Sequence, residues 1–374
     1  MIWWTITVIE VADVFRRYGS EYLRKFAQRM PPSHRHAFKD ILRCRTPAMG
    51  GHVFECNHCG RRQYSYHSCR NRSCPKCHKS DIQAWLQARE KELLPVPYYH
   101  VIFTLPHELR AFTRRNQQKV YGLLIKSAAH SILKLSADPR YVGGRVGVMA
   151  VLHTWGSNLT YHPHVHCLVT GGGLSSDGQT WMPAREDYLV PVKALSRLFR
   201  GRFLYSISKQ FKDIELPKSI RKKDWVIHCK PAVQGTCAVL NYLARYIHRV
   251  AITNSRIISA DNGKVSFRCK GSGGAQTRIM TVSAEEFIRR FLQHVLPAGV
   301  HKVRYYGLWS PSNRKKLLEV QQNLTQSGND QQEGFEEDVD VEAPQPPEVR
   351  KCPYCQSGTL IWIRRLPRQG RAPP

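Results

Sequence analysis

The spacing of the cysteines in the segment CNHCGRRQYSYHSCRNRSCPKC constrains the fold more than any other feature. This segment contains two Cys-x-x-Cys pairs, Cys56 with Cys59 and Cys74 with Cys77, separated by fourteen residues. Two pairs at this spacing are typical of knuckles that close one tetrahedral zinc site, and zinc sites with four protein ligands are usually structural. The sequence therefore predicts one structural Zn²⁺ held by these four cysteines.

Other cysteines and histidines leave alternatives open. The candidates for a second site or for a substituted ligand are Cys69, His58, His67 and His78. A further pair, Cys352 with Cys355, precedes the strand-like run TLIWIRRL and is typical of half a zinc ribbon. Either distant residues such as Cys44 and Cys69 complete this pair, or the pair is an unliganded remnant.

The chain is strongly basic, with a formal net charge of +29 and a pI near 9.9. Such a charge indicates a polyanionic partner, with nucleic acid as the first candidate. Eight of the 28 acidic residues lie in one short segment: Asp330, Glu333, Glu336, Glu337, Asp338, Asp340, Glu342 and Glu348. The stretch from Thr325 to Glu348 is also rich in Gln and Pro, which predicts a disordered linker.

A membrane span is excluded, because no run of about 18 apolar residues occurs in the chain. The first fifteen residues, MIWWTITVIEVADVF, contain Glu10 and Asp13 and lack a basic leader. With 42% hydrophobic residues, the chain can bury a sizeable core. We therefore expect a globular protein of the cytosol.

Hydrophobic periodicity predicts the order of the secondary-structure elements. Helices are expected over residues 12–44, 81–95, 108–135, 238–248 and 288–296. Strands are expected over residues 98–106 and 146–156, followed by a strand that carries several histidines.

This histidine strand, YHPHVHCLVTGGGL, suits the binding of a divalent metal ion. Side chains of a strand alternate between faces, so His164 and His166 share one face while Val165 enters the core. His162 has the same parity, but Pro163 interrupts the ladder and places His162 at the entry of the strand. Two imidazoles on one face can hold a metal ion from one side and leave the other positions to substrate oxygens. Taken alone, such a pair is more often a surface feature.

Downstream, the segment NYLARYIHR places two tyrosines on one face of an expected helix. Tyr242 and Tyr246 are four residues apart, a spacing that by itself more often reflects packing than chemistry. Arg245 and Arg249 accompany them, either as phosphate-binding groups or as ordinary surface charge.

In combination, these motifs resemble those of the HUH endonucleases, and more narrowly the rolling-circle transposases of the insertion sequence 91 family. The motifs are CRNRSCPKC, FTLP, HTWGSNLTYHPHVHCLVTGGGL, YLARY and VRYYGL, in this order between Asp13 and Leu308. Ser73 stands where the family commonly has a histidine, and both tyrosines are present although some relatives carry one.

The resemblance implies an α+β fold. An HUH-endonuclease-like antiparallel sheet would carry the histidines centrally beneath packed helices, next to an N-terminal helical zinc-binding domain. We expect four parts: a zinc-binding and DNA-binding domain over residues 1–95, a catalytic domain over 96–322, an acidic linker over 323–349, and a Cys-x-x-Cys tail over 350–374.

The resemblance also implies an activity, that of a transposase which cleaves and rejoins single-stranded DNA at the ends of an insertion sequence. Tyr242 and Tyr246 would form 5′-phosphotyrosine intermediates in alternating roles. His164 and His166 would bind Mg²⁺ or Mn²⁺, with His153 as the first choice of third ligand and His162 as the second.

The implied partners are single-stranded DNA, DNA hairpins at the element ends and target DNA, in the cytoplasm of a bacterium. The oligomeric state stays open. The alternatives are a replication initiator or relaxase with the same chemistry, and a non-catalytic zinc-dependent nucleic-acid-binding protein.

Overall fold

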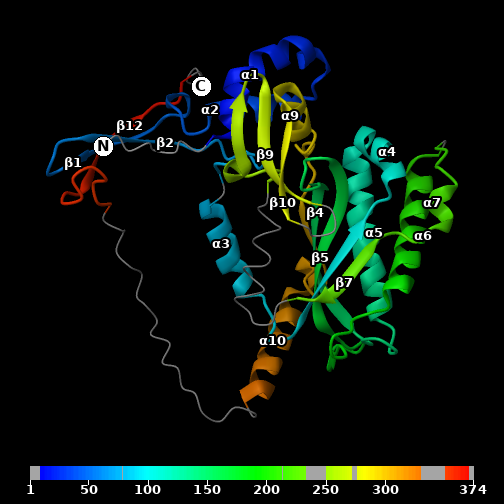
Figure 1. The fold of residues 1–374 in the computed structure, drawn as a ribbon. Helices are drawn as coiled ribbons and strands as arrows, with labels where there is room; N and C mark the ends of the chain where they lie inside the picture. Colours follow the sequence, from blue (N-terminus) through cyan, green and yellow to red (C-terminus); the bar gives the residue numbers. More distant parts are fainter. Residues whose placement is uncertain are drawn as a thin grey trace.

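The computed structural model describes residues 9–77, 79–212, 214–232, 250–271, 276–329 and 350–369. These residues form three antiparallel sheets with packed helices, which confirms the predicted α+β class (Figure 1).

The largest sheet carries the histidine strand at its centre. Its strand order is β11-β4-β5-β3-β7, and β6 adds to β5. The strands are β3 (Tyr98–Thr104), β4 (Arg145–Trp155), β5 (Tyr161–Leu174), β6 (Trp181–Pro183), β7 (Ile227–Pro231) and β11 (Val303–Gly307). Because β5 pairs with both β4 and β3, it is a central strand, and its histidines lie at the middle of the sheet and not at an edge. The resemblance predicts this position for the histidines.

Helices cover one face of this sheet (Figure 1). They are α4 (Arg110–Arg115), α5 (Gln117–Ser136), α6 (Val192–Gln210) and α7 (Ser219–Lys222). Helix α5 places buried apolar residues at helical spacing, such as Val120, Leu124 and Ala128, so one stripe of the helix faces the sheet. On the sheet, the odd-numbered residues of β5, including Val165 and Cys167, belong to the same buried cluster and face α5.

A second, smaller group of buried apolar residues covers the lower part of the sheet face opposite α5. Helices α3 (Lys79–Glu90) and α10 (Arg314–Asn329) lie on this side. Trp309 stacks on Tyr98 there, with ring centroids 5.9 Å apart. The upper part of this face carries His164 and His166, because even-numbered residues of β5 point away from α5.

The N-terminal helices share a core with a sheet from the second half of the chain. Helices α1 (Val11–Phe26) and α2 (Pro32–Arg43) pack against α9 (Ala284–Leu292) and the sheet of β8 (Ile257–Asp261), β9 (Lys264–Lys270) and β10 (Thr277–Ser283). Phe15 joins the two halves, since its ring lies 4.6 Å from Phe38 and 5.4 Å from Phe291. This core therefore crosses the boundary expected at residue 95.

The third sheet pairs a strand near the C-terminus with two strands from the first seventy residues. Its order is β12-β1-β2, where β1 is Gly51–Cys56, β2 is Arg62–Tyr66 and β12 is Leu360–Leu366. Strand β12 pairs antiparallel with β1 from Gly51↔Leu366 to Cys56↔Leu360. The expected C-terminal tail is thus one strand of the N-terminal sheet (Figure 1).

Three expected element boundaries need correction. Helix α10 continues to Asn329, so residues 323–329 are helical and not part of a linker. The helix expected over 108–135 is divided at Asn116, whose side-chain amide donates to Phe112 O. Helix α9 begins at Ala284, because the Ser283 hydroxyl accepts a hydrogen bond from the backbone N–H of Glu286. The helix expected over 238–248 lies outside the described residues.

Among the described residues, no helix combines the length and the apolar character needed to cross a bilayer.

Candidate metal centres

Three histidines come together on the face of the central sheet that α5 leaves uncovered. His153 lies on β4, and the antiparallel register pairs it directly with His164 of β5. One ring nitrogen each of His153, His164 and His166 lie within 4.8 Å of one another. Three imidazole nitrogens this close, on two hydrogen-bonded strands, can hold one divalent ion and leave its remaining positions open.

Neighbouring groups orient two of these rings. The Nδ1 of His164 lies 2.7 Å from the carbonyl oxygen of His162, to which it donates. The Nδ1 of His166 lies 2.9 Å from the Nε2 of His100, a buried residue of β3. Burial lowers the pKa of His100 to about 4, so its ring is neutral near pH 7 and Nε2 can accept. Both hydrogen bonds leave Nε2 as the ligand nitrogen of His164 and His166.

His162, the second choice of third ligand, has another partner. It lies at the entry of β5, next to Pro163, where the pairing with β4 is irregular. Its Nδ1 lies 2.9 Å from the Nη2 of Arg110, and burial followed by this guanidinium lowers the pKa of His162. The structure therefore groups His153, and not His162, with the pair on β5.

The cysteines form two clusters, and the predicted grouping of Cys56, Cys59, Cys74 and Cys77 in one site is wrong. Cys74 and Cys77 lie with Cys44 and Cys69. Cys56 and Cys59 lie with Cys352 and Cys355.

The β1–β2 hairpin is the reason for this separation. Cys56 ends β1 at the tip of the hairpin, whereas the segment after β2 returns to the base. Five residue steps at about 3.3 Å each place tip and base roughly 17 Å apart. One ion cannot bridge that distance, so the two Cys-x-x-Cys pairs lie in different clusters.

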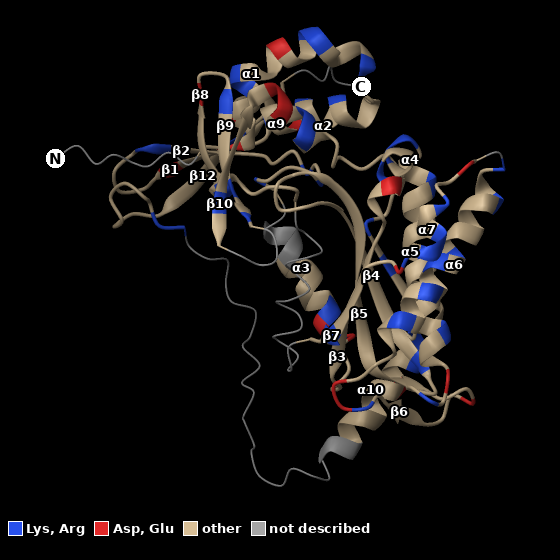
Figure 2. Ribbon diagram, turned by 45° about the vertical axis from the view of Figure 1, so that its right-hand side comes forward, with Lys and Arg blue, Asp and Glu red and all other residues tan. Residues whose placement is uncertain are grey.

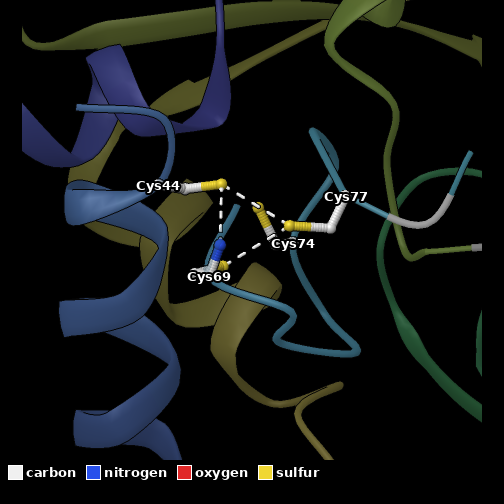
Figure 3. A group of neighbouring side chains, drawn as sticks. All are labelled: Cys44, Cys69, Cys74 and Cys77. Atoms are coloured by element: carbon white, nitrogen blue, oxygen red, sulfur yellow. Dashed lines mark hydrogen bonds between the residues drawn. The ribbon is translucent and has the colours of Figure 1, made fainter. Parts of the chain in front are cut away.

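The first cluster, Cys44 with Cys69, Cys74 and Cys77, has the dimensions of a zinc site (Figure 3). The Sγ atom of Cys77 lies 3.5 Å from that of Cys44 and 3.6 Å from that of Cys69. Tetrahedral zinc with Zn–S bonds of about 2.3 Å requires sulfur atoms about 3.8 Å apart. Backbone N–H groups of Cys69 and Asn71 point at two of the sulfurs, as thiolates require.

This first cluster lies inside the shared core of α1, α2 and α9. Cys44 follows the last residue of α2, and both it and Cys74 are fully buried. Arg72, within the cysteine loop, donates hydrogen bonds of 2.7 Å to the carbonyl oxygens of three residues after α9: Leu296, Pro297 and Val300. The loop therefore joins the N-terminal helices to the second half of the chain.

Several other candidates are not part of either cluster. Ser73, at the family's histidine position, donates its backbone N–H to the Asn71 side chain. His67 packs edge-on against His52, and His58 donates its backbone N–H to the sulfur of Cys56. The candidates His78, Tyr242, Arg245, Tyr246 and Arg249 lie outside the residues that the structure describes.

Two residues of these sites, His100 and Cys44, are not indicated by the sequence motifs. His100 interrupts an otherwise apolar strand, YYHVIFTLP, and that single polar residue is the signal that could have indicated it. Cys69 is one of the predicted alternatives for a substituted ligand, and it lies with Cys74 and Cys77. Cys44 is predicted only as a partner of Cys352 and Cys355, which is wrong, and no local pattern links it to Cys74 and Cys77.

Comparison with family models assigns most of the chain. Residues 14–105 match a transposase zinc-binding domain, and residues 147–316 match a putative transposase domain. All four cysteines of the first cluster fall within the first range, whereas Cys352 and Cys355 fall in neither.

Two curated relatives cover much of the chain. A putative transposase from Sinorhizobium fredii is 40% identical over 95% of this chain and 94% of its own length. The transposase for insertion sequence element IS801 of Pseudomonas savastanoi is 29% identical over 71% of this chain and 68% of its own length. A solved bacterial tRNA(His) guanylyltransferase-like protein in complex with ATP matches with a TM-score of 0.23 and 11% identity, over 59% of this chain and 99% of that one, which is too low to indicate a shared fold.

Proposed function

Because the chain belongs to the insertion sequence 91 family of transposases, with its N-terminal zinc-binding domain, we propose that it cleaves and rejoins single-stranded DNA at the ends of an insertion sequence through 5′-phosphotyrosine intermediates.

The grouping of His153, His164 and His166 carries this proposal. A divalent Mg²⁺ or Mn²⁺ ion on these three nitrogens would polarise a scissile phosphate and stabilise its developing charge. The histidines approach the ion from two adjacent strands, which leaves the side away from the sheet for phosphate oxygens. Hydrogen bonds from His164 and His166 to their neighbours fix both rings before DNA binds.

Tyr242 and Tyr246 are the proposed nucleophiles. The phenolic oxygen of one tyrosine loses its proton and attacks the phosphorus of a phosphodiester. The 3′ oxygen of the preceding nucleotide leaves and takes up a proton, so the DNA 5′-phosphate is bonded to tyrosine. One phosphoester replaces another, so a 3′-hydroxyl can reverse the step at a new position. The second tyrosine holds or cuts the next strand.

Basic residues available for phosphate contact occur on both sides of the central sheet. Figure 2 shows Lys and Arg along α4, α5 and α6, which cover the face opposite the histidine triad, and on the β9–β10 hairpin. Arg245 and Arg249 are proposed phosphate contacts beside the tyrosines. Neutralising phosphates releases counterions, so affinity would fall steeply with salt concentration.

The sheet β12-β1-β2 offers a surface for unpaired bases. A groove of about 570 Å³ on it is lined by Phe54, Tyr64, Tyr66, Arg350 and other residues. Tyr64 is 51% exposed and stacks on Tyr66 with ring centroids 6.1 Å apart. Exposed aromatic rings among arginines bind unpaired bases by stacking, which suits the single-stranded parts of a hairpin.

The test is formation of a covalent adduct with labelled single-stranded DNA that carries the element's end. The full-length protein is incubated with Mg²⁺, Mn²⁺ or EDTA, as wild type, Tyr242→Phe, Tyr246→Phe and the double variant. We expect a metal-dependent adduct that survives denaturation and is absent from the double variant. Tyr205→Phe, at a half-exposed position on α6, is the matched control and should keep full adduct.

Three further results would separate the alternatives. His153→Ala and His164→Ala should lose the adduct while retaining zinc and DNA binding. DNA binding without adduct under every metal condition would contradict the proposal and favour a non-catalytic DNA-binding protein. Cleavage without rejoining to a second DNA would favour a replication initiator.

A further inference from the structure

We infer that Cys56, Cys59, Cys352 and Cys355 hold a second structural Zn²⁺, which fastens the C-terminal strand β12 to the N-terminal sheet. The two pairs come from opposite ends of the chain, since Cys56 and Cys355 are 299 residues apart.

The sulfur positions match tetrahedral zinc. The Sγ atoms of Cys56 and Cys355 lie 3.6 Å apart, and those of Cys59 and Cys352 lie 3.8 Å apart. These distances equal the edges of a zinc tetrathiolate, about 3.8 Å, and greatly exceed a disulfide bond of about 2.05 Å. All four are free cysteines.

The backbone around each pair forms a matching knuckle. The N–H groups of His58 and Cys59 point at the Cys56 sulfur, at 3.4 Å and 3.5 Å. On the other side, the N–H of Gly358 points at the Cys355 sulfur at 3.4 Å. Both knuckles therefore offer hydrogen bonds to thiolates, the form of cysteine that binds metal.

Gly358 is needed for the two knuckles to meet. A Cβ atom at this position would lie 2.4 Å from the Cys56 sulfur and 2.6 Å from the His58 Cβ. Asn57 adds a polar link, because its Oδ1 accepts from the N–H of Thr359 at 2.8 Å. The chain thus brings a glycine, and not a side chain, to the point of closest approach between the pairs.

Apart from its backbone pairing with β1, strand β12 buries little side-chain surface. None of its seven residues is buried, and Ile361, Trp362 and Ile363 are 51%, 56% and 43% exposed. An open three-stranded sheet with so little apolar burial is marginal in water, and small modules of this kind usually depend on a metal or disulfides. A metal ion at the end of the β1–β12 pair supplies the missing free energy.

The first test is the zinc content of the full-length protein. We expect two Zn²⁺ per chain in the wild type and one in the variant Cys352→Ser/Cys355→Ser. Cys229→Ser changes a partly buried cysteine outside both clusters and should keep two. One Zn²⁺ in the wild type, or two in the double variant, would overturn the inference.

The second test asks whether the metal fastens the C-terminal strand. A specific protease site is inserted between residues 330 and 349 and cut in the folded protein. In the wild type, native mass spectrometry should find the C-terminal fragment still bound. In Cys352→Ser/Cys355→Ser it should dissociate without a chelator, while the zinc of the first cluster remains.

Gly358→Ala separates a metal role from a loss of thiol chemistry, since it keeps all eight cysteines of the two clusters. We expect it to lower zinc content to one and release the cut fragment, whereas Gly201→Ala, within α6 and with open space around it, should lower neither. A cut fragment that stays bound in both the Cys352→Ser/Cys355→Ser and Gly358→Ala variants would contradict the inference. None of these measurements depends on DNA cleavage.

Discussion

The Nε2 of His100 lies 2.9 Å from the Nδ1 of His166, across the pairing of β3 with β5. His100 does not belong to the histidine triad, but its contact occupies the Nδ1 of His166 and leaves Nε2 of that ring for the metal ion. A histidine ligand whose second nitrogen donates to a fixed acceptor is both oriented and more basic.

His100→Phe should therefore weaken metal binding at the triad without unfolding the chain. Outer partners of metal ligands typically contribute a factor of about 10–100 in affinity. We expect the Kd for Mn²⁺, measured by calorimetry or electron paramagnetic resonance, to rise by about that factor. His301→Gln, at an exposed position, is the control. An unchanged Kd in His100→Phe would show that the His100–His166 contact does not orient the ligand.

The first cysteine cluster should contribute to global stability because it lies inside the core of α1, α2 and α9. Cys44→Ser should release one zinc ion and lower the free energy of unfolding by several kcal/mol, since structural zinc contributes folding free energy directly. Zinc content and thermal unfolding measure the two effects. Cys269→Ser is the matched control, because Cys269 is buried in the same core but is not in a cluster. It should retain zinc and lose less stability.

At three glycines, the surroundings predict three different effects of substitution by alanine on the free energy of unfolding. Gly307 has φ +64°, and a Cβ there would lie 2.0 Å from the Val146 carbonyl oxygen, so Gly307→Ala combines strain with overlap. Gly263 has φ +70° in open space, so Gly263→Ala costs only the left-handed strain of about 1–2 kcal/mol. Gly201 lies in α6 with nothing nearby, so Gly201→Ala should stabilise by about 0.5–1 kcal/mol.

Chemical denaturation of these three variants should give the order Gly201→Ala above wild type, then Gly263→Ala, then Gly307→Ala. Equal losses at Gly263 and Gly307 would contradict the close approach of β11 to β4.

His294 should make stability depend on pH. Burial lowers its pKa from 6.5 to about 3, and the nearby Arg114, Arg289 and His34 act in the same direction. Between these two pH values the unfolded chain binds a proton that the folded chain does not. The contribution of neutral His294 to the free energy of unfolding is therefore fully present above about pH 6.5. It is lost as the pH falls towards 3, by about 1.4 kcal/mol per pH unit.

This slope is measured as a difference between variants. Acid also releases zinc from thiolates, but it does so equally in the wild type and in His294→Gln. The unfolding free energy of His294→Gln should fall less steeply below pH 6.5 than that of the wild type. Parallel curves would show that His294 does not titrate as a buried neutral group.

The order of strands and helices follows from local pattern, and the sequence predicts it well. The alternation through His164, Val165 and His166 predicts a strand with the histidines on one face and Val165 on the other, and these faces are the ones observed. The apolar spacing of α5 likewise identifies the face that packs on the sheet. Such signals lie within a few residues of one another, so one sequence contains them completely.

The cysteine partners could not be predicted, because their grouping depends on distant segments. Cys56 and Cys74 carry the same Cys-x-x-Cys signal, and only the hairpin between them decides that they belong to different sites. The core that joins Phe15 to Phe291 has no local signature either. The start of α9 was predictable, since Ser283 and Glu286 have the spacing of a helix cap.

The pairing of β12 with β1 places a strand made late in translation next to one made early. Cys355 leaves the ribosome 299 residues after Cys56, a delay of roughly 15–60 s at about 5–20 residues per second. During that interval the β1–β2 hairpin of the nascent chain has neither its third strand nor a complete set of thiolates at its tip. A message truncated before residue 350 yields a chain that keeps the histidine triad and the first cysteine cluster but never completes this sheet.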